Sequence, residues 1–246
     1  MTLAIIGGTG LTSLPGLEID RREMVHTPFG EPSGPLTHGH LNEQRVIFLA
    51  RHGYGHTIPP HGINYRANIW AMQQAGATCV LAVAAVGGIS AELAPGTLAA
   101  PDQIIDYTWG RANTFFEQDL DRVTHVDFTQ PYDATLRGRL LSAAGECDVA
   151  MVDGGCYGAT QGPRLETAAE IRRLQRDGCD MVGMTGMPEA VLARELELPY
   201  TTCAVVANWA AGVHGDTPIA MSEIERILKT GMANVRCVLG SMINGF

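Results

Sequence analysis

Apolar runs and amphipathic segments alternate along most of the chain. Short continuous apolar runs bounded by glycine or polar residues are typical of strands buried on both faces of a sheet. The sequence predicts such strands at residues 3–6, 46–50, 79–86, 149–157, 180–183 and 200–207. Apolar positions at helical spacing predict helices after Gly186 and at residues 64–75, 136–144, 166–177 and 221–239. This alternation favours an α/β fold with a central sheet flanked by helices.

Two segments lack a regular period. Residues 11–44 are rich in glycine, proline and histidine, which predicts loops and short edge strands. Residues 101–131 predict a strand followed by a long loop, and loops of that length are usually functional or intersubunit. No internal repeat, low-complexity run or linker divides the sequence, so we expect one domain over residues 1–246.

The acidic balance limits the kinds of partner. With 17 Lys and Arg against 26 Asp and Glu, the net charge of -9 disfavours a nucleic-acid partner, because binding a phosphate backbone needs a basic surface. The sequence has no signal peptide and no apolar run near the roughly 20 residues that span a bilayer, so we expect a cytoplasmic protein without a membrane partner. A buried pocket for one small anion is compatible with this charge.

The cysteines and histidines give no metal pattern. The six cysteines are scattered, without a CxxC pair or a Cys/His cluster at metal spacing, so we expect reduced core thiols. His38, His56 and His61 show no spacing that points to a metal either. We therefore expect no metal site.

Polar or glycine-rich residues mark five of the predicted strand ends. In open α/β sheets ligands bind just beyond the strand ends, so these residues are expected to converge on one site. They are residues 7–10, 51–52, 84–88, 184–185 and 208.

Several of these ends suit an anion, and phosphate is the first ligand to suspect. The helix after Gly186 presents free N–H groups and its positive dipole end behind the Thr185 hydroxyl. Thr9 lies in a glycine-flanked turn that allows close backbone approach, although a plain tight turn has the same sequence. Arg51 can bind phosphate bidentately or form a structural ion pair with an acidic residue. His52 is either a phosphate or leaving-group contact or an ordinary loop histidine.

Two further residues suit a purine base. Glu166 is either a ligand carboxylate or a first-turn residue of its helix, and Asn208 is either a ligand or a turn residue. Together they complement a lactam edge with a neighbouring ring nitrogen, because a carboxylate accepts an N–H and a carboxamide both donates and accepts. A dinucleotide site is disfavoured, since the glycine turn at residues 8–13 lacks the third glycine of that fingerprint.

Six motifs, taken in order, resemble those of a known family. They are IIGGTGL at residues 5–11, ARHG at 50–53, HTIPPHGINYRANIWA at 56–71, AVGG at 85–88, QGPRLET at 161–167 and GMTGMPEAVLARE at 183–195. With them the chain resembles, nearly end to end, the trimeric purine nucleoside phosphorylases and their methylthioadenosine phosphorylase branch. The resemblance implies a single domain with a central mixed β-sheet, a homotrimer with its site at the subunit interface, and no metal or organic cofactor.

The resemblance also implies phosphorolysis, in which inorganic phosphate attacks C1′ of a purine nucleoside and releases the purine and a pentose 1-phosphate. The family positions that contact phosphate fall on Thr9, Arg51, His52 and Thr185. The positions near the sugar fall on Ala84, Ala85 and Met184.

Departures from the methylthioadenosine branch change the expected nucleoside. That branch has an aspartate at position 208, whereas 6-oxopurine enzymes pair a glutamate with an asparagine, as Glu166 and Asn208 do here. A count without gaps from Asn208 puts Met221 where 6-oxopurine enzymes place a histidine for the 5′-hydroxyl, with Ile224 one helical turn later. This apolar pair suits a 5′-methylthio group. His125 matches a residue that the family lends to the neighbouring subunit's 5′ pocket.

Both ends together predict 5′-methylthioinosine as the substrate and hypoxanthine and 5-methylthioribose 1-phosphate as the products, a step of purine salvage. The alternatives are a methylthioadenosine phosphorylase with an unusual base pocket, an inosine and guanosine phosphorylase, and a catalytically silent purine-binding trimer. Two other departures each remove one contact: Ala84 replaces a threonine near the phosphate, and Leu165 replaces an aromatic residue beside the base.

Overall fold

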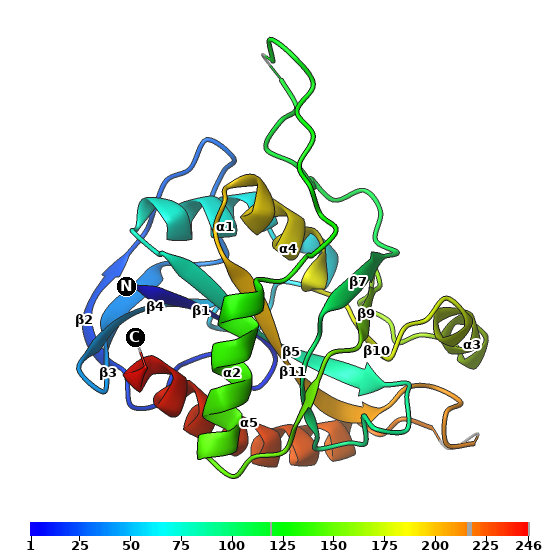
Figure 1. The fold of residues 1–246 in the computed structure, drawn as a ribbon. Coiled ribbons are helices and arrows are strands. Elements are labelled where there is room, and N and C mark those ends of the chain that lie inside the picture. Colours follow the sequence, from blue (N-terminus) through cyan, green and yellow to red (C-terminus); the bar gives the residue numbers. More distant parts are fainter. Residues whose placement is uncertain (119, 216–217, 246) are drawn as a thin grey trace.

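The computed structural model describes residues 1–118, 120–215 and 218–245 (Figure 1). Eleven strands of these residues form one mixed sheet at the centre of the molecule. The strands are β1 (Leu3–Gly7), β2 (Glu18–Glu23), β3 (Leu36–Leu41), β4 (Gln44–Ala50), β5 (Cys79–Gly88), β6 (Leu98–Ala100), β7 (Gln103–Asp106), β8 (Met151–Asp153), β9 (Cys156–Ala159), β10 (Met181–Gly183) and β11 (Tyr200–Trp209). The helices are α1 (Tyr65–Gln74), α2 (Ala134–Glu146), α3 (Ala168–Arg176), α4 (Gly186–Glu195) and α5 (Met221–Asn244), with a 3₁₀ turn at Pro60–Gly62.

The sheet divides at β5. On one side, β5 pairs in parallel with β1 as far as Ala82 and then antiparallel with β10 from Gly87 onward. On its other side, β11 pairs with it in parallel along almost its whole length. Residues 83–86 therefore lie between the end of one neighbour and the start of the next, and a cavity forms at this opening.

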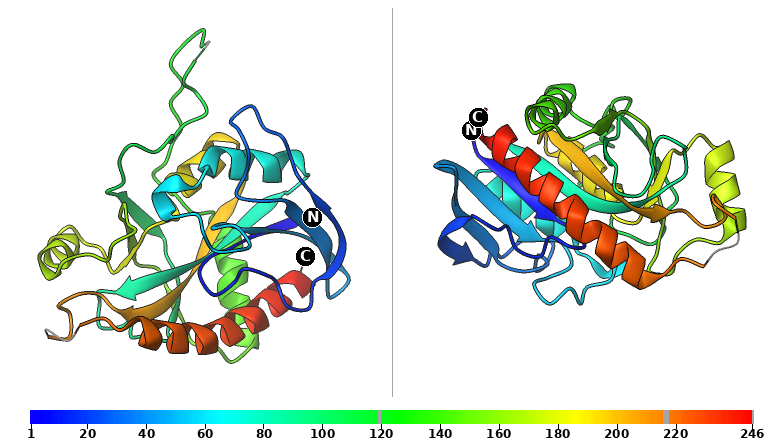
Figure 2. Two further views of the ribbon diagram at one scale, coloured as in Figure 1. Left: turned by 180° about the vertical axis from the view of Figure 1, so that it is seen from behind. Right: turned by 90° about the horizontal axis from the view of Figure 1, so that it is seen from below.

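Helices cover both faces of the sheet. α1 and α4 pack together on one face, and α2 and α5 pack together on the other (Figures 1 and 2). Successive strand residues serve opposite faces: Ile6 joins the core under α1 and α4, and Ile5 joins the core under α2 and α5. This burial on both faces explains why the strands are continuously apolar. α3 lies to the side of the sheet, where Ile171 and Leu174 enter a smaller cluster.

The strands predicted from apolar runs are present, with three corrections. Residues 149–157 form two short strands, β8 and β9, because Gly154 and Gly155 have positive φ angles of 104° and 100° that interrupt the extended chain. β11 continues to Trp209 through a bulge next to Asn208, so Asn208 is a strand residue and the turn interpretation is wrong. β3 lies inside the sheet, between β2 and β4, whereas the sequence predicts only loops and edge strands in that region.

The start of α3 also differs from the prediction. Its N-cap is Thr167, whose hydroxyl accepts the N–H of Glu170 while the Glu170 carboxylate accepts the N–H of Thr167. This capping box places the helix start at Ala168 and leaves Glu166 in front of it. The interpretation of Glu166 as a first-turn residue is therefore wrong.

The predicted long loop is present between β7 and α2. Residues 107–133 have no helix or strand among their described residues, and the middle of this segment projects from the body of the molecule (Figure 1). Residue 119, which falls within this predicted loop, lies outside the described residues.

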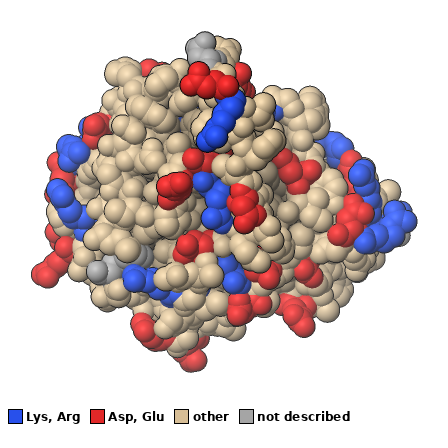
Figure 3. Space-filling model, turned by 45° about the horizontal axis from the view of Figure 1, so that its top comes forward, with Lys and Arg blue, Asp and Glu red and all other residues tan. Residues whose placement is uncertain are grey.

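The surface carries charges of both signs. On the face shown in Figure 3, basic and acidic side chains are interspersed.

All six cysteines are free thiols. Within the three described ranges, no helix combines the length and the hydropathy that a bilayer crossing needs.

Candidate active site

A cavity of about 300 Å³ opens where the sheet divides, beside residues 84–87 of β5. Strand ends from the two sides of this opening contribute to its lining, together with the turn before α4 and the start of α5. Every predicted site residue except His125 lines it. They are Thr9, Arg51, His52, Ala84, Ala85, Leu165, Glu166, Met184, Thr185, Asn208, Met221 and Ile224.

The turn after β1 approaches β5 very closely. A Cβ atom on Gly8 would lie 2.5 Å from the Val83 carbonyl oxygen and 2.9 Å from Nη1 of Arg51, so only glycine fits there. This contact brings the backbone next to Thr9 against the Arg51 guanidinium, with Thr9 lining the same cavity. The glycine turn thus places Thr9 at the cavity, and its contact with phosphate stays a prediction.

The turn before α4 supplies a second hydroxyl. Thr185 is only 7% exposed, lines the cavity and does not cap the helix with its side chain. Met187 has extended backbone angles (φ -118°, ψ 139°), so the continuous helix starts after it. The anion site predicted for this wall would therefore depend on the turn at Thr185 and Gly186 more than on an uninterrupted helix dipole.

Arg51 forms the structural ion pair that the sequence left open. Its Nε and Nη2 donate to the two carboxylate oxygens of Glu189 at 2.7 and 2.8 Å, and Nη1 donates to the Val83 carbonyl at 2.9 Å. Burial lowers the pKa of Arg51, but the attraction of Glu189 outweighs it and raises that pKa above its ordinary value. These bonds use three of the five N–H groups of the guanidinium, which leaves one on each Nη atom for a ligand.

His52 is a neutral ring in this environment. Burial, followed by the charge of Arg51, lowers the pKa of His52 to about 4. Its Nδ1 lies 2.8 Å from the carbonyl oxygen of Ile58, which can only accept, so Nδ1 carries the proton. Nε2 is then an acceptor, and it suits the P–OH group of a hydrogen phosphate better than a bare phosphate oxygen.

Glu166 and Asn208 line the cavity with groups still available for a base. Oε1 of Glu166 accepts the Thr160 hydroxyl at 2.6 Å, and Nδ2 of Asn208 donates to the Trp209 carbonyl at 2.7 Å. In the described part of the chain, Oε2 of Glu166 and both Oδ1 and the second N–H of Asn208 have no such partner. The pair therefore offers two acceptors and one donor, as a lactam edge and a ring nitrogen require.

The apolar part of the lining comes mainly from the start of α5. Ile224 is buried, whereas Met221, the first residue of the helix, is 61% exposed. Met184 and the 40% exposed Leu165 also line the cavity. Met221 and Ile224 thus both line the cavity one helical turn apart, and their expected contact with a 5′-methylthio group stays a prediction.

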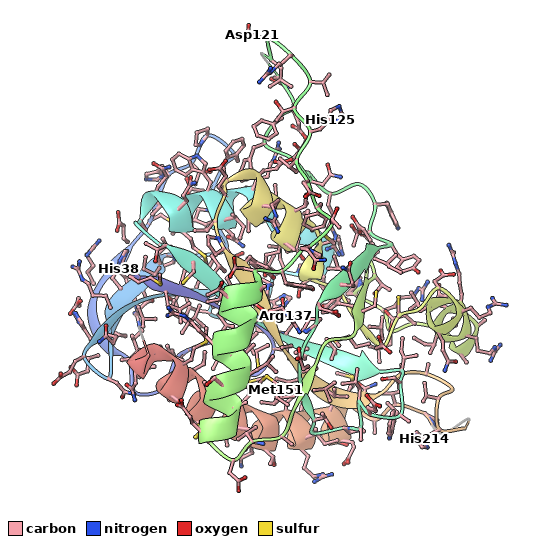
Figure 4. The ribbon with its side chains drawn as sticks, viewed as in Figure 1. His38, Asp121, His125, Arg137, Met151 and His214 are labelled. Atoms are coloured by element: carbon pink, nitrogen blue, oxygen red, sulfur yellow. The ribbon has the colours of Figure 1, made fainter. Side chains whose placement is uncertain are left out.

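His125 is the predicted site residue that the fold does not bring to this cavity. It lies on the projecting loop between β7 and α2 (Figure 4), and it is not among the residues that line the cavity. Within a single chain, His125 therefore does not line the cavity to which it was expected to contribute.

Two residues of the site were missed from the sequence. Glu189 lies inside the GMTGMPEAVLARE motif, where a lone carboxylate among apolar residues signals a buried ionic partner. Thr160, which donates to Glu166, gives no comparable signal. Among the residues that the structure describes, no group of three or more His, Cys, Asp and Glu could hold a metal ion.

Comparison with known proteins agrees with this geometry. The sequence matches the phosphorylase superfamily over residues 2–243. It is 53% identical to a probable S-methyl-5′-thioinosine phosphorylase of Xanthomonas campestris pv. campestris over 245 residues, which cover 100% of this chain and 98% of that protein. It is 44% identical to the 6-oxopurine nucleoside phosphorylase of Pyrococcus furiosus, covering 98% of this chain and 91% of the relative.

Solved structures show the same architecture. The fold superposes on methylthioadenosine phosphorylase from Schistosoma mansoni in complex with adenine with a TM-score of 0.92 at 30% identity, covering 99% of this chain and 91% of that one. The match of nearly the whole sequence, the high identity to relatives and this agreement in fold lead to one assignment: the chain is a member of the phosphorylase superfamily.

Proposed function

We propose that this protein catalyses the phosphorolysis of 5′-methylthioinosine to hypoxanthine and 5-methylthioribose 1-phosphate. One observation carries the proposal: a single cavity is lined by the cation Arg51, by the polar pair Glu166 and Asn208, and by the apolar residues Met221 and Ile224. The relative from Xanthomonas campestris, at 53% identity, bears the name of this activity as probable, which supports the choice of nucleoside.

The cavity residues suit a displacement at C1′ of the sugar. A phosphate oxygen forms a bond to C1′ while the bond from C1′ to N9 breaks, and the electron pair of that bond passes to the purine. Arg51, Thr9 and Thr185 would hold the phosphate in position for this attack. Donation from the Asn208 amide to N7 would stabilise the negative charge on the departing base.

Selection of the base follows from Glu166 and Asn208. Hypoxanthine has an N1–H donor and an O6 acceptor on its lactam edge, and the Glu166 carboxylate would accept the N1–H. Adenine has an acceptor at N1 and would leave the carboxylate facing a lone pair, which a buried site penalises. The apolar pair at Met221 and Ile224 would take the 5′-methylthio group, because a hydroxyl there would lose its hydrogen bonds to water.

The proposal requires no metal or organic cofactor, since inorganic phosphate is the second substrate. It includes a homotrimer in which His125 reaches the 5′ end of a neighbouring subunit's cavity, because that residue does not line the cavity of its own chain. Sedimentation of the purified protein tests the assembly. Recovery of a monomer as the active species would contradict this part.

The decisive experiment measures phosphate-dependent base release from 5′-methylthioinosine, 5′-methylthioadenosine and inosine at equal concentration, with a control lacking phosphate. We expect the highest kcat/KM with 5′-methylthioinosine. A preference for 5′-methylthioadenosine would overturn the assignment of Glu166 and Asn208. A preference for inosine would overturn that of Met221 and Ile224, and no release from any of the three would overturn the proposed activity.

A further inference from the structure

Arg111 lies in the irregular segment after β7, and its guanidinium collects main-chain oxygens from two separate parts of the chain. Nη1 donates to the carbonyls of Met184 at 2.9 Å and Met187 at 2.6 Å. Nη2 donates to the carbonyls of Gln161 at 3.0 Å and Thr160 at 3.3 Å. Four main-chain carbonyls therefore converge on one cation.

These carbonyls belong to two walls of the cavity. The base wall, residues 160–166, leads from β9 to Glu166, and the phosphate wall, residues 183–187, leads from β10 through Thr185. The pairing of β9 with β10 ends with a bond of 2.8 Å from the Thr160 N–H to the Gly183 oxygen. Beyond that bond the two walls have no strand pairing with each other, and Arg111 donates to both of them.

A guanidinium is the group that this geometry requires. Four carbonyl dipoles that point their negative ends at one place repel one another, and a cation among them removes the repulsion. Arg offers five N–H groups in a fixed planar fork, whereas the ammonium of Lys offers three on a flexible stem. A neutral side chain would leave the oxygens facing each other, so the two walls would move apart.

Neighbouring contacts hold Arg111 in position. Before Arg111 in the chain, the Trp109 N–H donates to Oε1 of Gln161 at 3.2 Å. After it, the Thr114 hydroxyl and the Phe115 N–H donate to the Glu195 carboxylate at 2.6 and 2.7 Å. The segment around Arg111 is therefore fixed both to the base wall and to α4, which follows the phosphate wall.

We propose that Arg111 is a positioning residue, which sets the distance between the base wall and the phosphate wall. Its role concerns the proposed phosphorolysis and rests on that function. Because Arg111 holds both walls, its loss affects phosphate and purine binding together. An arginine that only stabilised the fold would leave both affinities of the folded protein unchanged.

The test compares Arg111→Met and Arg111→Lys with Arg137→Met. Arg137 is a matched control: it lies on α2 (Figure 4) and also donates to two main-chain carbonyls, those of Ala100 and Pro101, but these belong to neither wall. Calorimetry measures the binding of phosphate alone and of hypoxanthine alone, and steady-state assays with 5′-methylthioinosine give kcat and both KM values. Arg111→Lys serves where Arg111→Met does not fold.

We expect Arg111→Met to weaken phosphate and hypoxanthine binding together and to lower kcat/KM by on the order of a hundredfold, the effect of misplacing reacting groups by about 1 Å. Arg111→Lys should recover only part of the loss, and Arg137→Met should keep both affinities. Weaker binding of one ligand alone, full recovery with lysine, or equal losses in Arg137→Met would overturn the proposal. If the wild type cleaves none of the nucleosides, the proposed function fails, while the two binding measurements still decide the role of Arg111.

Discussion

Replacing Glu189 with glutamine tests whether Arg51 serves the anion site. The side chains of this pair are 1% and 0% exposed, and Glu189 also accepts the Tyr200 hydroxyl at 2.8 Å. Glutamine has nearly the same shape and keeps one acceptor, but its amide N–H₂ group faces the donors of Arg51. The variant therefore retains the packing and leaves a buried guanidinium without its counter-charge.

The burial of this ion pair sets the expected loss of folding stability in Glu189→Gln. Removing one partner of a buried ion pair costs about 3–5 kcal/mol, because the remaining charge stays buried without compensation. A loss of that size corresponds to a fall in Tm of roughly 6–20 °C for a protein of this length. Phosphate at a hundredfold excess over its Kd stabilises the wild type by about 2.7 kcal/mol. If the phosphate contacts Arg51, it compensates the buried charge that has lost its partner, so the same phosphate concentration should stabilise Glu189→Gln by more than that amount.

The assay is thermal unfolding of the wild type and Glu189→Gln across a phosphate titration. Asp153→Asn is the control, since Asp153 also pairs with an arginine, Arg137, and neither residue lines the cavity. We expect a larger phosphate-induced rise in Tm for Glu189→Gln than for the wild type or the control. Equal rises in all three proteins would refute the placement of phosphate at Arg51.

Three other predictions concern single side chains. Asn208→Asp should shift the ratio of kcat/KM toward 6-aminopurine nucleosides, because the dual donor and acceptor role is lost; unchanged selectivity would contradict the base assignment. Met221→His should raise activity on inosine relative to 5′-methylthioinosine, and a constant ratio would show that Met221 does not contact the 5′ group. His52 has a pKa lowered to about 4, below its unfolded value of about 6.5, so the unfolded state binds more protons in that window and stability falls as pH drops through it. Urea unfolding of His52→Gln should show a smaller fall between pH 6.5 and 4 than the wild type, and an equal fall would refute this origin.

Much of the fold could be predicted because burial on both faces gives an unmistakable pattern. The strand at residues 79–86 is continuously apolar, and the structure shows why: β5 lies between two helical layers. The split of residues 149–157 at Gly154 and Gly155 could not be predicted with the same certainty, since an apolar run does not report φ angles. The sheet division at β5 depends on which strands are neighbours, and no local pattern contains that information.

The residues that line the cavity could be predicted, because the ends of neighbouring strands lie close together in the sheet. Thr9, Arg51, Thr185 and Asn208 are each at or near a strand end, and the fold gathers them into one cavity. Their partners could not be found in this way, since Arg51 and Glu189 are 138 residues apart and pair only through the packing of α4 on the sheet. Arg111 lies in a segment without any regular period, so its convergence with four carbonyls has no sequence signal.

For Arg51, the two roles that the sequence offers as alternatives are compatible with each other in the structure. The sequence offers a phosphate ligand or a structural ion pair as alternatives for one guanidinium. The geometry permits both, because Glu189 and Val83 engage three of its N–H groups and the cavity borders the remaining edge. The ion pair even favours a binding role, since a cation held rigidly by a buried carboxylate needs little reorganisation when an anion arrives. A buried charge pair beside a cavity is therefore best understood as part of the site, and the phosphate titration of Glu189→Gln measures how far the two roles depend on each other.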